Sequence, residues 1–202
     1  MKPRLIIEQK ITIFVNQYRI FAATSEGIKG QLTGFAQQKR LAFKEKVSFY
    51  TDEQKSALNF TFRAEKVLDV HGRYFVEDAN GQMIGMFRKV FGKSLFNSTW
   101  RVMDAAGNEL YEVHESNMAL AVLRRFGGQL PIIGGIIELI VLFFKYHFDI
   151  VDVATNQVVG EYRKTTLFRD HYETLLDDAA VSRIDARTWS AVCVALDALQ
   201  SR

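Results

Sequence analysis

Three segments of the chain repeat one alternation of apolar and polar positions. They span residues 74–85, 100–111 and 148–160, and each begins with an aromatic residue and reaches an aspartate before a short polar turn. An apolar strand resumes after each turn. Alternation with a period of two predicts that the first apolar residues of each segment share one face of a sheet. These residues are Tyr74 and Val76, Trp100 and Val102, and Phe148 and Ile150.

The polar residues between the two halves of each segment predict a hairpin turn. An aspartate side chain accepts hydrogen bonds from the backbone two residues further on, and a glycine supplies the positive φ that such turns require. Gly81 and Gly107 occupy that position, and Asn156 replaces glycine in the third loop, which is one residue longer. The alternative is a metal site, but turn formation explains all three aspartates, so we expect none. They are Asp78, Asp104 and Asp152.

Two other segments have helical spacing. Residues 30–43 place Leu32, Phe35, Ala36 and Phe43 on one side, which predicts a short N-terminal amphipathic helix. Near the C-terminus, Asp185 is a suitable N-cap for a helix that is apolar on nearly every side. At roughly 15 residues it is short for a membrane span, so we expect it to be buried. Its predicted core residues are Trp189, Val192, Cys193, Leu196 and Leu199.

The composition is that of an ordinary globular domain. The chain has 202 residues, enough to bury a core without a disulfide or a metal, and its 16 Phe and 2 Pro favour sheets. A net charge of +3 does not call for a nucleic-acid partner, and none is expected. The single cysteine fits a reducing compartment, and charges interrupt the N-terminal segment before a signal sequence forms. We therefore expect one domain over residues 1–202 and a cytoplasmic location.

An apolar insert at about residues 118–146 separates the second hairpin from the third. Its centre, residues 126–144, carries one charge, Glu138, and is flanked by Arg124, Arg125 and Lys145. A helix over residues 132–144 would reach only about 20 Å, against roughly 30 Å for a bilayer core. A single crossing would also place the third hairpin on the opposite side of the membrane from the first two.

The insert therefore has three interpretations. It is buried or covered by a partner, it dips into a membrane surface, or it is a misread span. Cationic flanks suit an anionic leaflet. A protein partner or a second copy of the chain would bury the same residues. The residues expected at such a contact are Ile132, Ile133, Ile136, Ile137, Leu139, Ile140, Leu142 and Phe143.

Basic pairs follow the second strands of two of the predicted hairpins. Arg88–Lys89 and Arg163–Lys164 occupy equivalent places in the first and third repeats. If the repeats are equivalent in space, the pairs lie at equivalent ends and suit phosphate head groups. The alternative is that they are solvated strand ends that protect sheet edges. With Arg124 and Arg125 they form the candidate lipid-binding set.

Hairpins of the form aromatic-x-Val-x-Asp-x-x-Gly, followed by a hydrophobic helix near the terminus, resemble the tubby-like superfamily. Residues 74–85 and 100–110 are similar to LURP-one-related and phospholipid-scramblase-like sequences, as is the run Leu123-Arg124-Arg125-Phe126. The resemblance covers roughly residues 5–200. It implies a closed antiparallel barrel of about twelve strands around a helix over residues 186–200. It also implies lipid or membrane contact, which is phosphoinositide binding in tubby proteins and lipid scrambling in scramblases.

No catalytic motif stands beside these features. The four histidines are isolated, and the chain has no G-x-S-x-G, phosphate-binding glycine loop or CxxC. The last helix is also not preceded by the acidic calcium loop of scramblases. The sequence thus predicts a non-enzymatic protein without a cofactor that contacts anionic phospholipid at the inner face of a membrane. The first alternative is a scaffold whose insert is buried in a partner or homo-oligomer, and the second is a phospholipid scramblase.

Overall fold

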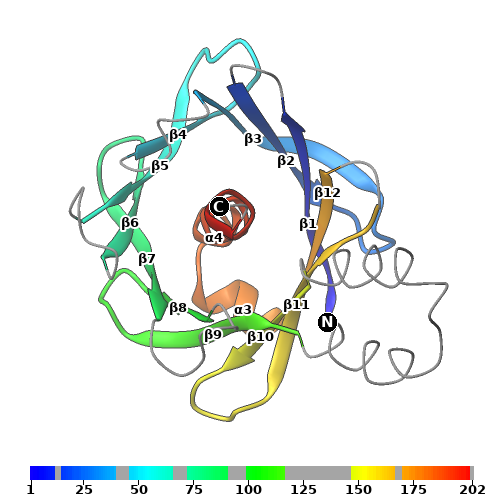
Figure 1. Ribbon diagram of the computed structural model, residues 1–202, viewed down its shortest axis with the longest axis vertical. Helices are drawn as coiled ribbons and strands as arrows, with labels where there is room; N and C mark the ends of the chain where they lie inside the picture. Colours follow the sequence, from blue (N-terminus) through cyan, green and yellow to red (C-terminus); the bar gives the residue numbers. More distant parts are fainter. Residues whose placement is uncertain are drawn as a thin grey trace, which may run out of the picture.

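The computed structural model describes residues 1–11, 15–39, 46–65, 72–90, 99–116, 147–166 and 170–200. In this part of the chain twelve strands form a closed antiparallel barrel, in which neighbours in sequence pair and β1 pairs with β12 (Figure 1). The expected barrel is confirmed. Its strands are β1 (Lys2–Ile11), β2 (Val15–Ala23), β3 (Lys29–Lys39), β4 (Lys46–Tyr50), β5 (Leu58–Ala64), β6 (Arg73–Asp78), β7 (Met83–Val90), β8 (Thr99–Met103), β9 (Glu109–Glu115), β10 (Phe148–Asp152), β11 (Val158–Lys164) and β12 (Asp170–Leu176).

The barrel has two ends that differ in their connections. Because successive strands are antiparallel, every odd-numbered strand finishes at the same end, which we call the far end. The other end, which we call the turn end, holds residues 24–28, 51–57, 79–82, 104–108, 153–157 and 177–185. Two helices follow β12, namely α3 (Asp178–Arg183) at the turn end and α4 (Ala186–Gln200). Figure 1 shows α4 within the ring of strands.

The three repeats form hairpins with the predicted turn chemistry. Oδ1 of Asp78 accepts the backbone N–H groups of Asn80 and Gln82, both at 2.9 Å, and Asp104 makes the equivalent bonds. Gly81, Gly107 and Asn156 have φ values of 81°, 90° and 56°. The backbone N–H of Asp78 bonds the carbonyl of Gln82, whereas that of Asp152 bonds Gln157, five residues on. The longer third loop is therefore confirmed.

The apolar residues that alternate along the repeats also face the core, as predicted. Val76, Trp100, Val102, Phe148 and Ile150 are buried in one hydrophobic core, and Tyr74 packs against it. These side chains belong to the same buried cluster as the apolar side chains of α4. The apolar half of each repeat is therefore a packing surface.

The predicted N-terminal amphipathic helix is wrong. Residues 29–39 form β3, which pairs with β2 along nearly its whole length. The register passes from Gly34 to Leu32, so Thr33 is an extra residue that forms a bulge and shifts the alternation by one position. Phe35 and Ala36 are consecutive and both buried, and this gave β3 its helical spacing. Phe43 lies outside the described residues.

Helix α4 is the core that the sequence predicted. Asp185 caps it, with Oδ1 accepting the N–H of Arg187 at 2.8 Å. Trp189, Val192, Cys193 and Leu196 are each 1% exposed, while the side chain of Leu199 lies outside the described part. The helix packs against β5, β6 and β7 and hydrogen-bonds to β2 and β12. Strands therefore surround it, which explains why it is apolar on nearly every side.

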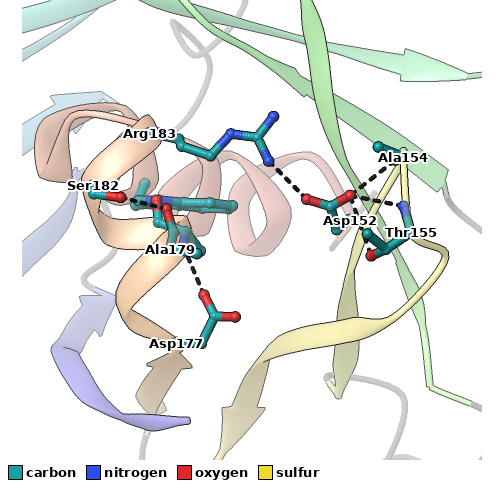
Figure 2. A network of polar contacts seen from close by, with 9 residues as sticks. Asp152, Ala154, Thr155, Asp177, Ala179, Ser182 and Arg183 are labelled. Atoms are coloured by element: carbon teal, nitrogen blue, oxygen red, sulfur yellow. Dashed lines mark hydrogen bonds and ion pairs between the residues drawn. The ribbon is translucent and has the colours of Figure 1, made fainter.

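A short polar network attaches α3 to the turn end (Figure 2). Asp177 caps the helix by accepting the N–H of Ala180 at 2.7 Å. Arg183, at the other end of α3, donates to Oδ2 of Asp152 at 2.8 Å. The same Asp152 also accepts the N–H groups of Ala154 and Thr155, which form its turn. One carboxylate therefore shapes the third hairpin and holds α3 against it.

Candidate functional site

The basic pairs occupy equivalent places in the barrel, as the repeats imply. β7 and β11 run in the same direction, and the pairs lie close to the point where each strand finishes. Nζ of Lys89 lies 5.7 Å from the ring centre of Trp100, and that of Lys164 lies 5.9 Å from Tyr172. Each ring belongs to the residue directly opposite on the next strand. Both lysines thus stand over buried aromatic rings near the far end.

The two arginines of the pairs are held by carboxylates. Nη2 of Arg88 lies 2.7 Å from Glu109, and Nη2 of Arg163 lies 2.8 Å from Glu173. Lys164 also has a carboxylate partner, Asp170, at 2.8 Å. An anion that approaches these side chains competes with the carboxylates or shares the cations with them. The pairs therefore suit weak, salt-sensitive binding of phosphate more than a tight site.

Strand register adds two further arginines to the neighbourhood of Arg88. Arg73 and Arg101 are its direct cross-strand partners on β6 and β8. A polar hollow of about 370 Å³ is lined by Arg73, Arg88, Glu65 and Glu109, together with Met103 and Gly107. The arginines lie far apart in sequence, so only the pairing of strands brings them together.

A buried carboxylate lies near the end of α4. Oδ1 of Asp197 accepts a hydrogen bond from the hydroxyl of Tyr172 at 2.5 Å, and Oδ2 accepts one from Tyr18 at 3.1 Å. Gln9 donates to the hydroxyl of Tyr18 at 2.9 Å. Burial raises the pKa of Asp197 to about 6, against the opposing effect of the two phenols. Sequence reasoning missed this residue, although a single acid in an apolar helix was its signal.

The apolar insert and its flanking arginines lie outside the described residues. This covers Arg124, Arg125 and the predicted contact residues between 132 and 143. The chain on both sides is described. The N–H of Ser116 donates to the carbonyl of His147 at 2.8 Å, so the chain leaves β9 and enters β10 at neighbouring points of the far end. The chain therefore enters and leaves the insert at the far end, where Lys89 and Lys164 also lie.

Cys193 and His171 have structural partners in the barrel. Burial raises the pKa of Cys193 to about 12, and its Sγ lies 3.2 Å from Oγ1 of Thr174. His171 lies 2.6 Å from Oγ1 of Thr165. Among the described residues, no three His, Cys, Asp or Glu side chains are grouped in a way that suits a metal ion. Within the same ranges, no helix combines the length and hydropathy that a membrane crossing requires.

The closed barrel with α4 inside it has the architecture that the tubby-like resemblance implies. The model of the LURP-one-related family matches residues 32–197, which is most of the chain. The chain therefore belongs to the LURP-one-related family. No curated protein and no solved structure gives a significant match.

Proposed function

We propose that this chain is a non-enzymatic, membrane-peripheral protein that contacts anionic phospholipid with the far end of its barrel. The proposal rests on two features, cationic side chains and the ends of the apolar insert, that lie at the same end of the barrel. Lys89 and Lys164, the last basic residues of β7 and β11, lie towards the end at which the chain leaves β9 and enters β10. The guanidinium of Arg88 instead reaches the hollow that includes Gly107 of the turn end. The apolar insert with its flanking arginines joins these two strands. Cations beside an apolar segment are the combination that a peripheral contact with an anionic leaflet requires.

The charge of the connecting sequences supports this orientation. The turn-end connections defined above contain seven acidic and two basic residues. The far-end connections, residues 12–14, 40–45, 65–72, 91–98, 116–147 and 165–169, contain eight basic and four acidic residues. An anionic surface therefore attracts the far end and repels the turn end. The eight basic residues are Arg40, Lys44, Lys66, Lys93, Arg124, Arg125, Lys145 and Arg169.

The basic residues and the apolar side chains of the insert have different roles. Each basic residue near an anionic surface contributes about 1 kcal/mol, so several cations give reversible binding that salt weakens. Apolar side chains of the insert, such as Ile136 and Leu139, would add a contribution that salt does not remove. Since carboxylates already hold Arg88 and Arg163, the flanking pair Arg124 and Arg125 is expected to contribute most of the charge dependence.

Flotation of the purified protein with vesicles tests the proposal. The protein is expected to float with phosphatidylserine-containing vesicles at low salt and to float much less with pure phosphatidylcholine. Absence of binding to anionic vesicles at low salt would overturn the proposal. A stable oligomer in sedimentation together with that absence would place the insert in a subunit interface, as the scaffold alternative requires.

A further inference from the structure

A second feature lies at the opposite end of the barrel from the proposed membrane contact. A pocket of about 180 Å³ lies between the barrel wall and the two helices at the turn end. Its lining is mostly apolar and comes from β1, β2, β3, β5, β12, α3 and α4. The apolar residues that define it are Leu5, Ala22, Phe60, Leu176, Val181 and Trp189.

Two arginines line the same pocket. Arg4 comes from β1 and Arg187 from the first turn of α4. Arg4 donates through Nη2 to Asp178, and its buried Nε has no acceptor among the described residues. Arg187 is held by Asp185 at 2.7 Å. Each guanidinium has five N–H donors, so both retain donors that these single carboxylates do not use.

The charge around the pocket differs from that of the turn end as a whole. Lys2 joins Arg4 at Asp178, with its Nζ 3.6 Å from the carboxylate. Three cations, Lys2, Arg4 and Arg187, therefore meet two carboxylates, Asp178 and Asp185. The charge of Asp78 also acts on Arg187 and raises the pKa of its guanidinium, after the larger effect of Asp185. A guanidinium binds a carboxylate through two parallel hydrogen bonds, which favours that anion at this place.

We propose that this pocket binds a small monocarboxylate with an apolar body. The apolar part lies against Phe60 and Trp189, and the carboxylate lies at Arg4 and Arg187. The size fits such a molecule, since an apolar cavity of about 150 Å³ holds a ligand as large as benzene. The body is either an alkyl chain or an aromatic ring. The pocket and the membrane contact lie at opposite ends, so either proposal can fail without the other.

Calorimetric titration of the full chain with three probes tests the pocket. Hexanoate and phenylacetate represent the two possible bodies, and hexylammonium has the same chain as hexanoate with the opposite charge. At least one carboxylate is expected to bind, and hexylammonium is expected to bind roughly tenfold more weakly or not at all. Arg4→Gln and, separately, Arg187→Gln are each expected to weaken carboxylate binding roughly tenfold, the effect of one lost charge-assisted hydrogen bond.

A substitution that fills the pocket gives the decisive test. Ala186 lines the pocket and is exposed, so Ala186→Leu adds apolar volume without removing a hydrogen-bonding side chain. This variant is expected to fold and to lose carboxylate binding. Val158→Leu is the matched control, because Val158 is a turn-end residue, 50% exposed, that does not line the pocket. Failure of both carboxylates to bind, equal binding of hexylammonium, or unchanged binding by Ala186→Leu would each overturn the proposal.

Discussion

The hydroxyl of Tyr172 donates a 2.5 Å hydrogen bond to Oδ1 of Asp197, the only acidic residue of α4. Tyr18 donates to the other carboxylate oxygen from β2. Two strands thus hold the last turns of the central helix through one buried side chain. Because these hydrogen bonds are directional and come from two different strands, they help to fix the rotation of α4 within the barrel.

The stability of the barrel is expected to depend on pH through Asp197. Its pKa is about 6 in the folded protein and about 3.9 in an unfolded chain, so the folded state binds the proton more tightly. The contribution is complete below about pH 4 and is lost as the pH rises through about 6, at a cost of about 2 to 3 kcal/mol. Urea unfolding across this range measures the effect.

Asp197→Asn provides the comparison for that experiment. Exposed carboxylates with a lowered pKa, such as Asp52 and Asp104, contribute an opposite slope at more acidic pH. The difference between the wild type and Asp197→Asn removes those common contributions. The variant is expected to gain stability relative to the wild type between about pH 4 and 6. Parallel pH profiles would contradict this account of Asp197.

The approach of α4 to β7 is expected to require a glycine at position 85. A Cβ added to Gly85 would lie 2.5 Å from Oγ1 and 2.7 Å from Cγ2 of Thr188. Gly85→Ala is therefore expected to lower the free energy of unfolding by about 1 to 3 kcal/mol, as overpacking does. Thr188→Ala removes both clashing atoms, so the double variant should lose less than the sum of the two single variants. Additive losses in chemical denaturation would count against this packing.

The ion pair between Arg183 and Asp152 is expected to hold α3 over the turn end. Arg183→Ala removes the bond but leaves Asp152 with its turn hydrogen bonds. Hydrogen exchange of the α3 amides is expected to accelerate, while exchange in β10 stays unchanged. Lys55→Ala is a suitable control, since Lys55 lies in another turn and has no carboxylate partner among the described side chains. Equal exchange in α3 of wild type and Arg183→Ala would exclude this role.

Local chemistry made much of the fold predictable. The aspartates and positive-φ residues of the hairpins act within five residues, so their sequence pattern is sufficient to predict the turns. The apolar C-terminal helix was also predictable, because its N-cap and its apolar residues lie within one short segment of the sequence. The bulge at Thr33 was not, because it is defined by pairing with β2. The consecutive buried residues Phe35 and Ala36 made β3 resemble a helix.

The candidate site was predictable only where it is contiguous in sequence. Arg88–Lys89 and Arg163–Lys164 are adjacent residues in a repeat, so their equivalence could be expected. Their partners Glu109 and Glu173 depend on how the strands pair, and so does the row that includes Arg73 and Arg101. The turn-end pocket depends on five strands and two helices, which no local pattern reveals.

Charge reversal at the two ends of the barrel is expected to affect membrane binding very differently. Arg124→Glu/Arg125→Glu changes the far-end sequence, whereas Lys2→Glu/Lys55→Glu makes the same change in net charge at the turn end. Lys2 and Lys55 both have exposed positions, so neither change should disturb the core. Comparing the two variants separates the effect of where the charge lies from the effect of the net charge.

Flotation of these two variants with phosphatidylserine-containing vesicles at low salt tests the central claim most directly. Loss of two cations at a surface corresponds to about 2 kcal/mol, so the far-end variant should bind at least tenfold more weakly than the wild type. The turn-end variant should bind within about twofold of the wild type, because the proposed orientation turns its charges away from the membrane. Equal weakening of both variants, or weakening of the turn-end variant alone, would contradict the proposed orientation.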